Sequence, residues 1–121
     1  MKVLITGGSG QLGRELLLRC PPDVEIVPCD LEDLDITDPD RVTAKVNEIR
    51  PRVVINAAAY TAVDRAEQER ERAFATNATG AGNVARAAQA VGARVIQIST
   101  DFVFGGERNR PYTPDADTAP L

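Results

Sequence analysis

Residues 2–16 read Lys-Val-Leu-Ile-Thr-Gly-Gly-Ser-Gly-Gln-Leu-Gly-Arg-Glu-Leu. The apolar run at 3–5 is typical of a strand buried on both faces, and leucines at helical spacing follow the glycine-rich turn. In such a strand–turn–helix unit, glycines allow a sharp turn, a close approach of the backbone to a pyrophosphate and tight helix packing. Amide groups of the first helical turn then face the phosphates. The stretch therefore predicts a dinucleotide-binding fold, against the alternative of an ordinary glycine-rich turn.

Two glycine spacings fit this turn equally well. The pattern G-x-G-x-x-G at residues 8–13 is the common dinucleotide fingerprint. The pattern T-G-x-x-G-x-x-G at residues 6–13 is the spacing of short-chain dehydrogenase/reductase relatives. The cofactor contacts predicted for the turn are Gly7, Gly10, Gln11, Leu12 and Gly13.

Length and composition narrow the functional class. The chain has 121 residues, enough for one small domain but short for a complete dinucleotide enzyme with a substrate domain. With 43% hydrophobic and 26% charged residues, and no apolar run near ~20 residues, it predicts a soluble cytoplasmic protein without membrane association. Fourteen Lys and Arg against 18 Asp and Glu give a net charge of −4, and the basic residues are scattered. We therefore expect no nucleic-acid partner.

The two cysteines do not suggest a metal or a disulfide framework. The chain has no histidine, and Cys20 and Cys29 are its only cysteines. A zinc site needs about four such ligands, so neither a zinc site nor a disulfide framework is predicted. We interpret both cysteines as small buried or half-buried hydrophobic residues rather than as a redox pair.

Strand-like and helix-like segments alternate along the chain without a repeat. The expected strands are 3–5, 24–28, 53–55 and 95–98, with 34–36 as a very short edge strand. The expected helices are 11–20, about ten residues from Pro39, and 65–90 with a break near Gly80 or Gly82, and a loop follows at 99–121. This alternation predicts an α/β, Rossmann-type doubly wound parallel sheet of strand order 3-2-1-4-5, incomplete at the C-terminus.

Acidic residues after the second strand suggest the adenosine side of a dinucleotide site. Asp30 stands where a carboxylate accepts hydrogen bonds from the ribose, although a solvated loop aspartate is the alternative. No Lys or Arg lies between residues 20 and 40 to offset its charge beside a 2′-phosphate, which favours NAD. We assign Asp35 to the adenine amino group and Ile36 to the face of the adenine ring.

Small and polar residues follow the later strands, where ligands bind in open α/β folds. Ala57, Ala58 and Ala59 would let a flat cofactor lie against the backbone, or would serve tight helix packing. Asn77, in an alanine-rich helix, is expected to have a polar partner in the backbone or in a ligand. The hydroxyl of Thr100 could donate to a carbonyl oxygen that gains negative charge during reduction, or could cap the following loop.

Two stretches closely resemble the dTDP-4-dehydrorhamnose reductase family, which is an extended short-chain dehydrogenase/reductase family. They are N-A-A-A-Y-T-A-V-D at residues 56–64, followed by Ala66-Glu67, and I-S-T-D-F-V-F at residues 98–104. The resemblance covers all 121 residues, and Pro111-Tyr112 with residues 115–121 resemble the loop before the family's catalytic Tyr-x-x-x-Lys helix. It implies that NADPH or NADH reduces the C4 ketone of dTDP-4-dehydro-L-rhamnose to give dTDP-L-rhamnose.

The same resemblance implies roles for individual residues. Thr100 would be catalytic and would polarise the ketone, beside a tyrosine acid and a lysine that lowers the pKa of that tyrosine. Tyr60 would contact the cofactor. The implied contacts with the nucleotide-sugar substrate are Thr61, Val63, Thr100, Asp101 and Phe102.

Departures from the family pattern limit what these residues can do alone. Phe102 stands where the family usually has Tyr, and Gly106 where Asp is common. Neither Tyr60 nor Tyr112 is followed by lysine four residues later, so Tyr-x-x-x-Lys is missing. We interpret residues 1–121 as the amino-terminal part of an NAD(P)-binding domain without its catalytic helix and substrate domain, and expect this part to be inactive alone.

Three further expectations follow from the resemblance. Glu15 matches a position that helps to bind Mg²⁺ at the dimer interface of some family members, which makes it a weak metal candidate and a homodimer a candidate assembly. One alternative function is a non-catalytic, NAD(P)-binding relative that resembles the regulatory subunit of methionine adenosyltransferase. Another is a nucleotide-sugar epimerase or dehydratase of the same branch.

Overall fold

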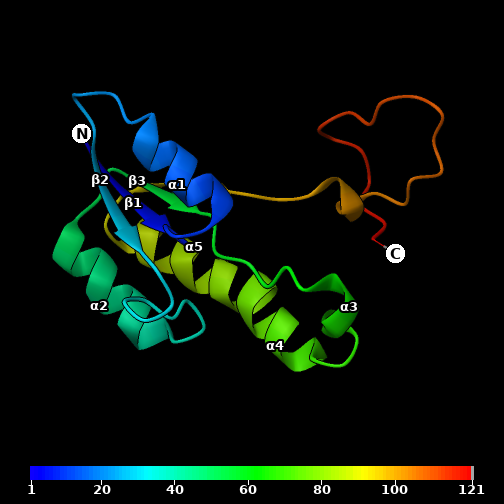
Figure 1. Ribbon diagram of the computed structural model, residues 1–121, viewed down its shortest axis with the longest axis horizontal. Coiled ribbons are helices and arrows are strands. Elements are labelled where there is room, and N and C mark those ends of the chain that lie inside the picture. The colour runs from blue at the N-terminus through cyan, green and yellow to red at the C-terminus, as the bar shows by residue number, and fades with distance from the viewer. Residues whose placement is uncertain (121) are drawn as a thin grey trace.

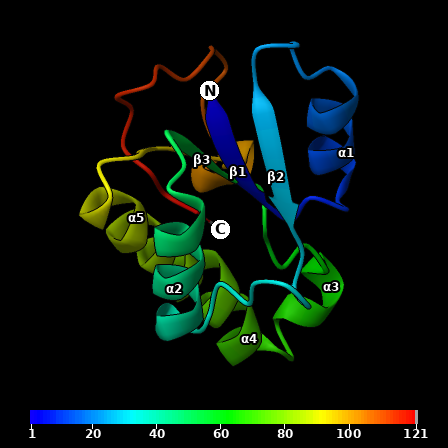
Figure 2. The same cartoon turned by 90° about the vertical axis from the view of Figure 1, so that its left-hand side faces the viewer.

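The computed structural model describes residues 1–120, which form a four-stranded parallel sheet with helices on both faces (Figure 1). The strands are β1 (Lys2–Thr6), β2 (Glu25–Cys29), β3 (Val53–Asn56) and β4 (Arg94–Gln97), in the spatial order β2-β1-β3-β4. The helices are α1 (Gln11–Leu18), α2 (Pro39–Ile49), α3 (Val63–Ala66), α4 (Arg70–Phe74), the π-helical turn η1 (Ala75–Gly80), α5 (Ala81–Ala90) and the 3₁₀ turn η2 (Asp101–Val103). Figure 2 shows α1 on one side of the sheet and α2 and α5 on the other.

The predicted strand order 3-2-1-4-5 is wrong at one place, because residues 34–36 form no strand. The four strands that do form keep the relative order predicted for them. Leu34 and Ile36 are each only 3% exposed, so their alternation with a polar residue mimics a strand. Between them, Asp35 accepts hydrogen bonds from the backbone nitrogen and the hydroxyl of Thr37, at 2.9 and 2.7 Å. This local turn directs the segment away from the sheet edge.

The helix boundaries follow the sequence signals at some positions and depart from them at others. Asp38 caps α2, since its Oδ1 accepts hydrogen bonds from the amides of Asp40 and Arg41. The predicted helix 65–90 is instead interrupted at residues 67–69, and its 75–80 part has π geometry. In the part of the chain that is described, no helix is long and apolar enough to cross a membrane.

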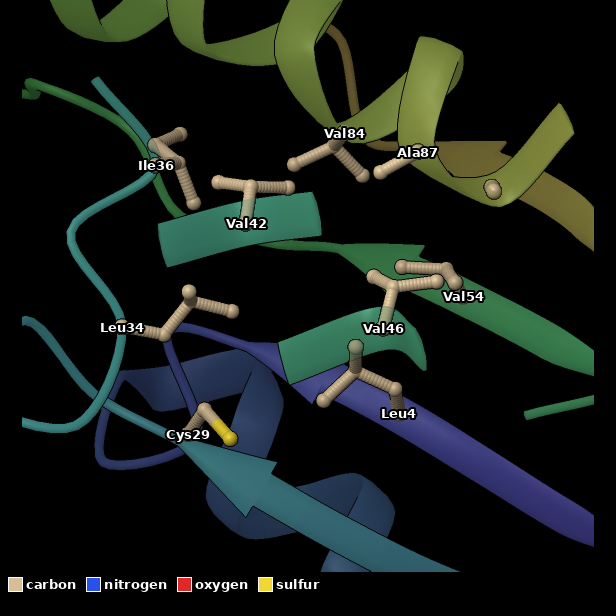
Figure 3. Packing of buried hydrophobic residues seen from close by; sticks show 10 residues of the cluster. Leu4, Cys29, Leu34, Ile36, Val42, Val46, Val54, Val84 and Ala87 are labelled. Atoms are coloured by element: carbon tan, nitrogen blue, oxygen red, sulfur yellow. The ribbon is translucent and has the colours of Figure 1, made fainter. Parts of the chain in front are cut away.

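The main core lies between the sheet and the pair α2 and α5 (Figure 3). Val42 and Val46 of α2 and Val84 of α5 pack over Leu4 of β1 and Val54 of β3, and each of these five is at most 1% exposed. Burial of one such side chain stabilises the fold by about 1.5–3 kcal/mol. This packing holds α5 against the sheet.

Strand β4 leaves an apolar edge uncovered in the 121-residue chain. Val95 and Ile96 of β4 and Ile98 just after it are 36%, 50% and 42% exposed. The opposite edge strand, β2, carries Glu25 and Pro28, which discourage pairing. We therefore expect this chain to self-associate through β4. Sedimentation and thermal melting across a concentration series measure this.

A charged residue on β4 should weaken the association. We expect Ile96→Lys to raise the dissociation constant about tenfold or more, because lysine resists burial at an edge-to-edge contact. Leu18→Lys is the control, since Leu18 is 79% exposed on α1, away from β4. A wild-type chain that stays monomeric and melts at a concentration-independent temperature would contradict the expectation.

Candidate functional site

A groove of about 780 Å³ opens at the carboxyl ends of β1, β2 and β3. Eight of the thirteen predicted cofactor residues line it, and they come from four separate segments: Gly7, Asp30, Asp35, Ile36, Ala57, Ala58, Ala59 and Tyr60. Gly10, Gln11, Leu12, Gly13 and Asn77 do not line it. The groove lies at the sheet edge where open α/β folds bind ligands.

The glycine turn forms one end of the groove. Gly7 has a φ of +71°, and a Cβ there would lie 2.9 Å from the backbone nitrogen of Ala58. The amide of Gly7 donates to the carbonyl of Cys29 at 2.8 Å, which ties the turn to the end of β2. A larger residue at this position would therefore force apart the two loops that meet there.

Helix α1 starts from this turn with its first amides free of helical partners. Gly10 is its N-cap and provides no side-chain hydrogen bond, so the amides of Gln11, Leu12 and Gly13 are left for other acceptors. A Cβ at Gly10 would meet only the carbonyl oxygen of Gly7, at 3.1 Å. A Cβ at Gly13 would lie 2.5 Å from that same oxygen. Gly13 is thus required for packing, whereas Gly10 leaves space in front of the helix end.

Carboxylates surround the part of the groove near the end of β2. Asp30 Oδ1 accepts a hydrogen bond from the amide of Ser9 at 2.7 Å, and Asp30 and Ser9 both line the groove. Glu32 and Asp35 line it as well, and Arg72 is the basic residue of the lining. Asp30 is therefore attached to the glycine turn, and its surroundings are predominantly negative.

The segment 34–37 forms the opposite wall. The hydroxyl of Thr37, and then its backbone amide, donate to Asp35 and hold the pKa of that carboxyl below its usual range. Both bonds go to Oδ1, and Oδ2 makes no hydrogen bond within the described residues. Asp35 is therefore ionised at neutral pH and has one oxygen available to a ligand.

Asn77 has a backbone partner, which is one of the two alternatives left open by the sequence. Its Oδ1 accepts from the amide of Tyr60 at 2.8 Å, and its Nδ2 donates to the carbonyl of Tyr60 at 3.0 Å. Asn77 lies in η1, and π-helical turns are frequent at functional sites. The Tyr60 hydroxyl is buried without a partner in the described part of the chain, and Arg72 lies 5.7 Å from the ring centroid.

The predicted substrate residues do not join the groove. Thr61 and Val63 line a separate hollow of about 380 Å³ formed by residues 61–65. Thr100 caps η2, because its Oγ1 accepts from the amide of Phe102 at 3.3 Å and donates to Asp101 Oδ1 at 3.3 Å. Phe102 is 74% exposed. These residues follow the ends of β3 and β4, while the groove lies over β1, β2 and β3.

Neither Glu15 nor the cysteines form a metal centre among the residues that the structure covers. Glu15 Oε2 pairs with Arg19 Nε at 3.0 Å, and no group of three or more metal-binding side chains occurs in residues 1–120. Cys20 is half-buried and Cys29 is buried, and both are free thiols. Burial raises the pKa of the Cys29 thiol, which keeps it neutral.

Several residues of the site were missed from the sequence. Ser9, Thr37 and Arg72 line the groove. At the carboxyl end of the sheet, the hydroxyl of Thr6 donates to Asn56, whose Nδ2 donates to Gln97 Oε1 at 2.7 Å. The signal for this row was available, because polar residues end three neighbouring strands of one parallel sheet.

The arrangement matches known proteins over the whole chain. The family model described as RmlD substrate binding domain matches residues 1–121. A dTDP-4-dehydrorhamnose reductase from Streptomyces griseus is 48% identical over 97% of this chain and 39% of its own length. This chain thus spans about two fifths of that relative.

Solved structures show the same relationship. A dTDP-4-dehydrorhamnose reductase from Clostridium acetobutylicum superposes with a TM-score of 0.96 at 49% identity, covering 99% of this chain and 43% of its own. The Bacillus anthracis reductase, solved in complex with NADP, gives 0.95 at 48% identity, with coverages of 98% and 43%. The Rossmann-like parallel sheet is therefore shared with these enzymes.

Proposed function

Since this chain belongs to the RmlD substrate-binding domain family, we propose that the complete protein reduces the C4 ketone of dTDP-4-dehydro-L-rhamnose with NADH or NADPH. In this proposal, residues 1–121 supply the adenosine and pyrophosphate side of the cofactor site. The observation that carries it is the groove beside Gly7, which joins the glycine turn, Asp30 and Asp35 in one cavity. The NADP complex of the Bacillus anthracis relative supports it.

The chemistry of the groove fits a nicotinamide dinucleotide. The pyrophosphate would accept from the free amides of residues 11–13, where the α1 dipole favours negative charge. Asp30 would accept from the ribose hydroxyls, and the free Oδ2 of Asp35 from the adenine amino group. Ala57 and Ala58 leave room for a flat group beside the backbone of β3.

Thr100 would act on the substrate rather than on the cofactor. The bound cofactor supplies the hydride for the ketone carbon, and the ketone oxygen then gains negative charge. An exposed hydroxyl at Thr100 can donate to that oxygen. Proton delivery requires an acid, which we expect from a Tyr-x-x-x-Lys pair elsewhere in the complete protein, so residues 1–121 alone should be inactive.

We expect the complete protein to prefer NADH to NADPH. Asp30, Glu32 and Asp35 line the groove, so a 2′-phosphate would lie among carboxylates. One like-charge pair at 4 Å costs about 4 kcal/mol at an effective dielectric constant of about 20, as an upper guide. Asp30→Asn should therefore lower the NADH-to-NADPH ratio of kcat/KM.

Glu25→Gln is the control, because Glu25 is an exposed carboxylate on β2 that does not line the groove. Equal kcat/KM values for the two cofactors would contradict the expectation.

The activity itself is tested with the complete protein, NADH or NADPH, and dTDP-4-dehydro-L-rhamnose. We expect ketone-dependent loss of the reduced nicotinamide absorbance and formation of dTDP-L-rhamnose. Cofactor binding without oxidation would instead favour the regulatory-subunit relative. Interconversion of sugar epimers without net cofactor consumption would favour the epimerase alternative. Either outcome would overturn the proposal.

A further inference from the structure

Asn83 is a buried amide on α5 that holds the wall of the groove without lining it. The residue is 3% exposed. Its Nδ2 donates to the carbonyl of Ile36 at 2.9 Å and to that of Thr37 at 3.3 Å. Its Oδ1 accepts from the guanidinium of Arg86. A buried amide needs such partners, and here the partners of its nitrogen belong to a loop 46 and 47 residues away in the sequence.

Gly80 lies one turn before Asn83, at the point where η1 continues into α5, and it contacts the same loop. A Cβ at Gly80 would lie 2.8 Å from Cδ1 and Cγ1 of Ile36, closer than two carbon atoms tolerate. Figure 3 shows Ile36 beside the helix that carries Val84. Ile36 is therefore held by a hydrogen bond to its carbonyl and by a close fit of its side chain.

The contacts continue from Thr37 to the ligand-facing carboxylate. Asn83 holds the Thr37 carbonyl, and the amide and hydroxyl of Thr37 donate to Asp35 Oδ1. Asp35, Ile36 and Thr37 all line the groove. A displacement of Asn83 would therefore change the orientation of the Asp35 side chain and the position of Ile36 in the wall of the groove.

We propose that Asn83 is a positioning residue for the adenine end of the groove, which it sets by binding the carbonyls of Ile36 and Thr37. The proposal rests on the proposed function, because it assumes that an adenine nucleotide occupies this wall. Without the amide donor, two carbonyl oxygens would face an apolar or empty space. The loop would then move to regain hydrogen bonds, since an unsatisfied buried acceptor costs about 1–3 kcal/mol.

Two variants test this in the complete protein, with ADP-ribose as the probe in calorimetric titrations. Asn83→Leu removes the donor at similar volume. Gly80→Ala leaves the donor but pushes Ile36, and it should fold because alanine favours a helix by about 1 kcal/mol over glycine. We expect each to weaken ADP-ribose binding about tenfold. The KM for NADH should rise by about the same factor, while kcat at saturating NADH stays within about twofold.

Val84→Ala is the control for general loss of stability. Val84 is the next residue on α5, is 1% exposed, packs into the core and does not line the groove. It should lower the melting temperature and leave ADP-ribose affinity unchanged. Unchanged affinity in both test variants, or an equal loss in Val84→Ala, would overturn the inference. Failure of the wild-type protein to bind ADP-ribose would instead overturn the proposed function on which it rests.

Discussion

We expect Thr100→Val in the complete protein to lower kcat by about 10²–10³-fold and to change KM for the sugar nucleotide far less. The reason is that the hydroxyl bond strengthens as the ketone oxygen becomes anionic, so its loss is felt in the transition state. In the structure Thr100 is exposed, and within residues 1–120 its hydroxyl bonds only the neighbouring Asp101 and Phe102. Steady-state kinetics over a range of sugar-nucleotide concentrations separates the two parameters.

Matched variants isolate the hydroxyl from other effects of this substitution. Thr100→Ser keeps the hydroxyl and should retain most of kcat. Thr43→Val is the control, because it also removes an exposed threonine hydroxyl, one that donates to the Pro39 carbonyl in α2. This variant should leave kcat unchanged. Loss of the η2 cap costs about 1 kcal/mol of stability, which thermal melting measures. If the Thr100→Val variant kept full kcat, Thr100 would serve only as the N-cap of η2.

We expect Gly10→Val to lower the affinity for ADP-ribose at least 100-fold, or about 2.8 kcal/mol. A Cβ at Gly10 would meet only the Gly7 carbonyl oxygen, at 3.1 Å, a tight contact that a shift of a few tenths of an ångström relieves. The added methyl groups would fill the space before the first amides of α1, where the pyrophosphate would lie. Binding should therefore be lost, and thermal melting measures separately what the tight contact with Gly7 costs in stability.

Gly105→Val makes the same chemical change elsewhere in the chain. A Cβ at Gly105 would meet the Ala119 carbonyl oxygen at 3.4 Å, an ordinary contact distance, and Gly105 does not line the groove. This control should bind ADP-ribose normally. Equal affinity of Gly10→Val and the wild-type protein would show that the α1 end does not hold the pyrophosphate.

The parts of this fold that depend on local chemistry were predictable from the sequence. Val3, Leu4 and Ile5 form the central strand, the glycine turn follows, and Asp38 with Pro39 starts α2. In each case the signal lies within a few consecutive residues. The groove followed from the same logic, because the carboxyl ends of parallel strands meet at one sheet edge.

The parts that depend on distant contacts were not predictable. Leu34 and Ile36 alternate like a strand, yet Thr37 turns the segment and Asn83 holds it against α5. The sequence left open what Asn77 binds, and in the structure both ends of its amide hydrogen-bond the backbone of Tyr60. The periodicity of apolar residues indicates which residues are buried. It does not indicate which neighbours bury them or which groups they hydrogen-bond.

We propose that the groove beside Gly7 binds the adenosine half of a nicotinamide dinucleotide. The most direct test is a calorimetric titration of residues 1–121, shown to be folded by circular dichroism, with ADP-ribose, NADH and NADPH. We predict that ADP-ribose and NADH bind with similar, weak affinity, because the contacts in these residues lie on the adenosine side. A folded sample that gives no binding with any of the three would contradict the account.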